Sequence, residues 1–186
     1  DLKNVFLFQL GLSNDFGRFN LSMPSHTKSR VGERKFNSGN LTALSGQDKK
    51  GIRFVSGDNL LKFLNIPASK VGWIKIDVEG FELNVIKGFI ETLKSTNAVF
   101  EVEVNALLMK ISKVKFDELE KLMKENSYIP FINNIVKKSS VKKSQQFDVF
   151  FIKKNLIDKI PKGLKISRLE KQFVYEWEKE FLKSLV

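Results

Sequence analysis

Short apolar runs alternate with amphipathic stretches along this chain, a pattern typical of an α/β domain. The runs predict strands at residues 4–12, 16–23, 41–44, 52–56, 72–77, 98–104, 128–136 and 147–152. Apolar residues three and four positions apart predict helices at 81–95 and 116–125, and a short helix at 60–64 that Asp58 would cap. Strands alternating with helices indicate a mostly parallel sheet covered on both faces. The last two strands follow each other through a hairpin, so we expect them to be antiparallel.

Three regions fall outside this alternation. Residues 24–51 are rich in Ser, Gly, Asn and Lys and predict a long loop, and residues 137–144 predict a basic hairpin tip. From residue 155 on, apolar residues recur at helical spacing, at Ile166, Leu169, Phe173, Trp177 and Phe181. This stripe predicts a helix packed on the domain, with a membrane-surface helix as the alternative. We therefore expect residues 1–154 to form the carboxyl-terminal portion of one domain and residues 155–186 a helical extension.

The amino-acid composition of the chain excludes several kinds of catalytic and metal-binding site. The chain of 186 residues has no cysteine and one histidine, His26, which excludes disulfides, thiol catalysis and a histidine cluster for zinc. No apolar run approaches the length of about 20 residues that a membrane span needs, so we expect a soluble or peripheral, cytoplasmic protein without a transmembrane segment. The net charge of +11 favours anionic partners. Because no aromatic RNA-binding strand or helix-turn-helix pattern is present, we expect no specific nucleic-acid partner.

Candidate catalytic residues gather around the segment 74–82, Ile-Lys-Ile-Asp-Val-Glu-Gly-Phe-Glu. It brings Asp77 and Glu79 to the end of a strand, where open α/β sheets bind their ligands. Glu103 occupies a similar place on the next predicted strand. These carboxylates suit proton transfer or the orientation of a hydroxyl group, and they leave a divalent metal possible, although no residue is assigned to one. In the structural alternative, Glu79 stabilises a helix N-terminus and Lys75 is an ion-pair partner.

The segment resembles the FkbM family of S-adenosylmethionine-dependent methyltransferases. The family core, Lys-x-Asp-x-Glu-Gly-x-Glu, is matched by Lys75, Asp77, Glu79, Gly80 and Glu82, and Glu103 matches the family's glutamate on the next strand. The resemblance covers about residues 4–153.

What the resemblance implies is a class I, Rossmann-like methyltransferase fold whose last strand is antiparallel, and S-adenosyl-L-methionine as the cofactor. It also implies catalytic roles for Asp77, Glu79, Glu103 and Lys75. Cofactor contacts are implied for Gly11, Leu12 and Ser13, which resemble the family's strand-ending turn, with Gly11 where alanine is usual.

One departure from the family concerns the cofactor. The glycine loop and the acidic residue for the ribose would precede Asp1, and no Gly-x-Gly loop occurs in the chain. We therefore expect an N-terminally truncated fold that is inactive alone.

The resulting hypothesis is a fragment of an O-methyltransferase for a small hydroxylated or saccharide acceptor. The alternatives are a basic, non-catalytic module for anionic polymers and a degenerate methyltransferase scaffold. The oligomeric state is left open.

Overall fold

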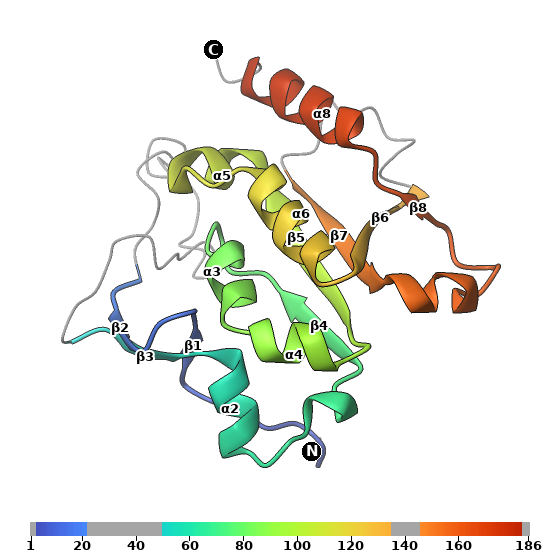
Figure 1. Cartoon of the computed structure of the whole chain (residues 1–186). Coiled ribbons are helices and arrows are strands. Elements are labelled where there is room, and N and C mark those ends of the chain that lie inside the picture. Colours follow the sequence, from blue (N-terminus) through green and yellow to red (C-terminus); the bar gives the residue numbers. More distant parts are fainter. Residues whose placement is uncertain (1–2, 22–49, 135–145, 184–186) are drawn as a thin grey trace.

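The computed structural model describes residues 3–21, 50–134 and 146–183, and the strands of these segments form two sheets (Figure 1). The smaller sheet has the order β1 (Gly11–Leu12), β3 (Ile52–Val55), β2 (Gly17–Phe19). The larger sheet has the order β4 (Trp73–Ile76), β5 (Val99–Asn105), β7 (Gln146–Lys153), β6 (Tyr128–Asn133), β8 (Ile166–Arg168). Several predicted features lie outside the described residues: the strand at 41–44, most of the 24–51 loop, His26 and the 137–144 hairpin tip.

Six α-helices are described: five lie between these strands in the sequence, and the sixth follows the last strand. They are α2 (Gly57–Phe63), α3 (Glu82–Lys87), α4 (Ile90–Ser95), α5 (Ala106–Ser112), α6 (Phe116–Glu125) and α8 (Lys171–Lys183), with 3-10 turns η2 (Ala68–Lys70) and η4 (Lys154–Lys159). The predicted 116–125 helix is confirmed as α6. The predicted 81–95 helix is interrupted at Gly88 and Phe89, and α5 was not predicted. The predicted extension is helical from Lys171 on, whereas the residues before it form η4 and β8.

The strand directions correct the prediction of a mostly parallel sheet. Only β1–β3 and β4–β5 are parallel among the described pairs, and β2–β3, β5–β7, β6–β7 and β6–β8 are antiparallel. A parallel pair needs a crossover, which α3 and α4 supply between β4 and β5. Strand β7 is antiparallel to both of its neighbours, β5 and β6, and β8 is antiparallel to β6. The predicted antiparallel pairing of β6 and β7 is confirmed.

The core lies between the larger sheet and the helices that cover one of its faces (Figure 1). Phe100, Val102 and Val104 of β5 are buried on this face together with Ile86 and Leu93 of the helices. The opposite face is different, because the β4 side chain of Trp73 is 54% exposed. No α-helix is described on that face, where only the 3-10 turn η4 lies near Trp73, so the predicted helical covering of both faces is not seen in the described residues.

The N-terminal segment corrects a second prediction. Residues 4–12 were expected to form a buried strand, but only Gly11 and Leu12 are paired, and Val5 to Phe8 are exposed, with Leu7 at 92%. The reason is that β1 is an edge strand, as is β4, so one side of each has no described hydrogen-bonding neighbour. Phe54 and Phe81, whose ring centroids are 6.0 Å apart, pack the smaller sheet against the start of α3.

Helix capping also differs from the sequence prediction. Ser56, not Asp58, caps α2, and its hydroxyl accepts a hydrogen bond from the Asn59 N–H. Asp58 instead accepts from the N–H groups of Glu91 and Thr92 at the start of α4, at 2.8 and 2.9 Å. Asp58 was assigned to the wrong helix because its partners lie 33 and 34 residues away.

The C-terminal helix α8 packs on the domain as the apolar stripe predicts. Trp177 is 1% exposed and meets the Phe147 ring edge-on at 4.7 Å. Lys171 pairs with Asp117 of α6 at 2.8 Å. The side chain of Phe181 lies outside the described residues, and no described helix is both long and apolar enough to cross a bilayer.

Candidate active site

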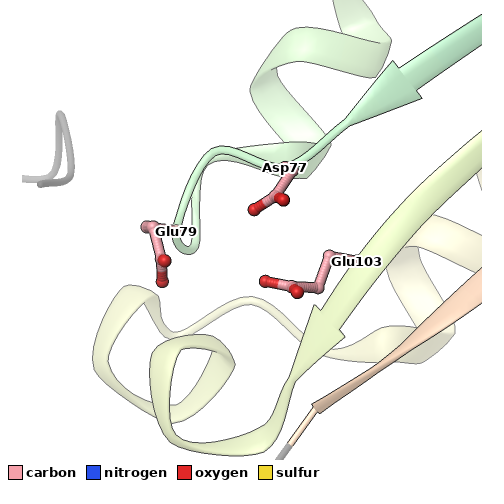
Figure 2. A group of neighbouring side chains, drawn as sticks. All are labelled: Asp77, Glu79 and Glu103. Carbon is pink, nitrogen blue, oxygen red and sulfur yellow. The ribbon is translucent and has the colours of Figure 1, made fainter. Parts of the chain in front are cut away.

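Three of the predicted catalytic carboxylates meet at the ends of β4 and β5. The register pairs Lys75 with Glu101 and Ile76 with Val102, which brings Asp77 alongside Glu103. Figure 2 shows these two side chains extending into the same space, with Glu79 beside them on the turn after β4. One carboxylate oxygen from each of the three residues lies within 4.8 Å of the others. The carboxyl ends of two neighbouring parallel strands therefore build an acidic site, as the sequence predicted.

The turn after β4 is conformationally unusual. Glu79 has a φ of 53° and Gly80 a φ of 96°, both in the left-handed region that favours glycine. For a glutamate this conformation costs about 1 kcal/mol or more. The Gly80 N–H donates to Glu82 Oε1 at 2.9 Å, which holds the turn against the start of α3. The Glu-Gly pair thus aims Glu79 into the acidic site at the expense of local strain.

Crowding of the carboxylates changes their protonation. Burial raises the pKa of Glu103 to about 7, helped by the negative charges of Asp77, Glu79 and Asp148 and by a hydrogen bond to Asp77. Burial also raises the pKa of Glu79, with smaller contributions from Asp77 and Glu82. Near neutral pH, Glu103 therefore exchanges a proton readily beside an acidic neighbour, which is the condition for general acid–base chemistry.

Lys75 is the cation of this site. Its Nζ lies 3.9 Å from Asp77, 3.5 Å from Glu101 and 3.8 Å from Asp148. Burial acts to lower the pKa of Lys75, but the charges of Asp148, Glu101 and Asp77 outweigh it, and the pKa is raised. Lys75 is therefore a protonated charge partner, a geometry that suits electrostatic stabilisation and not proton abstraction.

The sequence reasoning missed three polar residues of the site. Asp148 of β7 is paired with Glu103 in register, and burial raises its pKa. Gln146 donates from Nε2 to Glu103 Oε1 at 2.7 Å and accepts from Asn105 Nδ2 at 3.1 Å. Side chains alternate along β7, so Gln146 and Asp148 lie on the same face of the strand. Only the pairing of β7 with β5 shows that this face borders the carboxylates.

The residues expected to contact the cofactor are only partly together. Gly11 and Leu12 line a cavity of about 210 Å³ with Asp77, Val78 and Phe81. Ser13 is not among the lining residues; it is 1% exposed, and its N–H donates to Val55. Ligand pockets usually measure about 300–1,000 Å³, so this cavity is smaller than an ordinary ligand pocket.

Two further features of the structure do not add residues to the candidate site. The spacing of the three carboxylates would admit one cation, but acidic groups of this kind are common without one, and no metal ligand is assigned. A larger apolar cavity of about 560 Å³ lies on the face of the larger sheet that carries Trp73, away from the carboxylates. Trp73, Phe150 and Ile160 are among its lining residues. No carboxylate lines it.

Fold and site together define a mixed α/β domain with a cluster of carboxylates at the ends of two parallel strands. Residues 3–130 match the model of the methyltransferase FkbM domain. This match spans more than half of the chain, which therefore belongs to the FkbM methyltransferase family.

A curated relative supports this assignment. The hexuronic acid methyltransferase AglP of Haloferax volcanii is 40% identical over 63 residues, which are 34% of this chain. The match spans only 25% of the length of that relative. No solved structure matches the chain.

Proposed function

We propose that the protein is an S-adenosylmethionine-dependent O-methyltransferase for a small hydroxylated or sugar-like acceptor. The observation that carries the proposal is the cluster of the Asp77, Glu79 and Glu103 carboxylates at adjoining strand ends in an FkbM domain. The relative named for a hexuronic acid supports a saccharide acceptor. The cytoplasmic location remains a prediction.

The side chains suit the handling of an acceptor hydroxyl group. Asp77 is exposed and can accept the hydroxyl proton, while Lys75 at 3.9 Å balances its charge. Glu103 lies beside Asp77 in the carboxylate cluster and can relay that proton. Bound S-adenosylmethionine would supply the methyl group, whose carbon–sulfur bond breaks as the acceptor oxygen bonds to carbon, and would leave as a neutral thioether.

We further infer that residues beyond the described ones complete the cofactor site. β1 and β4 each present an edge that no described strand pairs, and the apolar residues Val5 to Phe8 are exposed beside β1. The unpaired edges of β1 and β4, each of which is parallel to its one neighbour, can form backbone hydrogen bonds with further strands. Gly11 and Leu12 would then form one wall of the cofactor pocket.

Calorimetry and turnover measurements test these proposals. The 186-residue chain should not bind S-adenosylmethionine, whereas the protein extended upstream of Asp1 should. In the extended protein, Asp77→Asn should lower turnover about a hundredfold or more, the usual contribution of a positioned acid or base. Asp158→Asn, on exposed η4, is the matched control and should leave turnover unchanged.

The opposite outcomes point to the other hypotheses. An unchanged rate in Asp77→Asn would give Asp77 a structural role. Salt-dependent binding of an anionic polymer, insensitive to Asp77→Asn and without methyl transfer, would support the basic binding module. Absence of both activities would support a degenerate scaffold.

A further inference from the structure

A hydrogen-bond relay runs from the N-terminus of α5 to the Glu103 carboxylate. Asn105 Oδ1 accepts from the N–H groups of Leu107 and Leu108 at 3.1 and 3.2 Å. Asn105 Nδ2 donates to Gln146 Oε1 at 3.1 Å, and Gln146 Nε2 donates to Glu103 Oε1 at 2.7 Å. Asn105 is 6% exposed, so the relay starts from a buried side-chain amide whose oxygen and nitrogen both make hydrogen bonds.

Chemistry fixes the orientation of both amide groups in this relay. Backbone N–H groups can only donate, so the oxygen of Asn105 must face α5 and its NH₂ must face Gln146. The oxygen of Gln146 must then face Asn105, and its NH₂ faces Glu103. The start of α5 therefore dictates that Glu103 meets a donor and not a carbonyl oxygen. A donor to a carboxylate makes a short, charge-assisted bond, in agreement with the 2.7 Å distance.

Strand pairing places the relay across two strands. Asn105 and Gln146 face each other in the register of β5 and β7, and Glu103 pairs with Asp148 one step away. Gln146 reaches Glu103 along the diagonal of the antiparallel ladder, within the usual range for long side chains. Because the relay holds one oxygen of Glu103, the other oxygen is left to face the Asp77 carboxylate in the cluster.

We propose that Asn105 and Gln146 are positioning residues that orient the Glu103 carboxylate toward Asp77 for the reaction. This inference rests on the proposed methyl-transfer function. Neither residue touches the reacting atoms; both act through Glu103.

Two substitutions break the relay in different ways. Gln146→Leu keeps a similar shape and removes the donor. Asn105→Asp keeps the oxygen that caps α5, since Asp is as good a cap as Asn, but replaces the NH₂ group by an acceptor. Gln146 must then turn its NH₂ group toward residue 105 and present its carbonyl oxygen to Glu103. Gln172→Leu is the matched control, because Gln172 donates to Glu176 at the same 2.7 Å on the exposed face of α8.

Turnover of the upstream-extended enzyme provides the first measurement. Gln146→Leu and Asn105→Asp should each lower kcat about ten- to a hundredfold, the range for a small misplacement of a catalytic group, with little change in the acceptor KM. Gln172→Leu should leave kcat and KM unchanged. Wild-type kcat in both relay variants, beside an active wild-type enzyme, would overturn the inference.

Side-chain amide NMR of the 186-residue chain provides the second measurement and needs no activity. The Gln146 NH₂ proton that faces Glu103 should lie downfield in the wild type, and the Gln146 NH₂ signals should change in Asn105→Asp, in which this group faces a different carboxylate. Unchanged Gln146 signals in Asn105→Asp would overturn the orientation argument. A wild-type enzyme without methyl transfer would contradict the proposed function, and this NMR result would still decide whether the relay exists.

Discussion

Replacing Glu103 by Gln should make the protein more stable at pH 8, although it removes a proposed catalytic residue. The amide has the shape of the protonated carboxyl group, so it can accept from Gln146 and donate to Asp77 without repacking. What it removes is a negative charge that Asp77, Glu79 and Asp148 oppose. Sites that crowd like charges for function commonly gain stability when one charge is neutralised.

The magnitude follows from the pKa of Glu103 in the two states. Its pKa is about 7 in the folded protein and 4.5 when unperturbed. Above pH 7 the side chain is ionised in both states and the folded state bears the full cost; below pH 4.5 it is protonated in both and the cost disappears. This group therefore makes the wild type less stable as pH rises from 4.5 to 7. The upper limit is about 3 kcal/mol, and solvent screening of a partly exposed side chain reduces it to about 1–2 kcal/mol.

Urea unfolding at pH 8 and pH 4.5 measures this effect. The free energy of unfolding of Glu103→Gln should exceed that of the wild type by about 1–2 kcal/mol at pH 8 and by a few tenths at pH 4.5. Glu125→Gln, on the exposed end of α6, is the control and should change stability by no more than about 0.5 kcal/mol at either pH. A Glu103→Gln variant that is less stable at pH 8, or equally shifted at both pH values, would refute the electrostatic account.

Three other substitutions test the packing that supports the site, each by urea unfolding at pH 7. Asp58→Ala should cost about 2–4 kcal/mol, because it leaves buried donors of α4 without their acceptor, whereas Ser56→Ala should cost about 1 kcal/mol or less; equal costs would show that Asp58 is an ordinary cap. Phe89→Ala should cost about 3–5 kcal/mol if the ring, 6% exposed, belongs to the core, and a cost near zero would place it outside. Gly88→Ala should cost about 1–3 kcal/mol, because a Cβ there meets the backbone carbonyl of Ser13; no loss of stability would mean that this contact yields freely.

Elements with a strong local signal were predictable from the sequence. The helix at 116–125 has its apolar residues at regular helical spacing and begins and ends where predicted. Strands β3, β4, β5 and β7 are short apolar runs within one or two residues of their predicted bounds. The grouping of Asp77 with Glu103 was also predictable, because the carboxyl ends of adjacent parallel strands lie at one edge of a sheet.

Features that depend on distant pairing were not predictable. Gln146 and Asn105 are 41 residues apart, and nothing in the spacing of either one indicates the other. Asp58 has the residue type and position of a cap for the nearby helix α2. It instead accepts hydrogen bonds from backbone N–H groups at the start of α4, 33 residues away. Val5 to Phe8 have the composition of a buried strand, yet a strand needs a neighbour for its backbone hydrogen bonds, and none is described there.

The sequence by itself determined where the acidic turn lies, which residue types it carries and the family to which it belongs. These properties reside in a contiguous segment whose glycine and carboxylates can be recognised without knowing their surroundings. Only the tertiary structure decided how the carboxylates are charged and held. The pKa of Glu103 and its relay to α5 arise from three strands that meet in space, because electrostatic energy and hydrogen bonding depend on distances between atoms and not on separation along the chain.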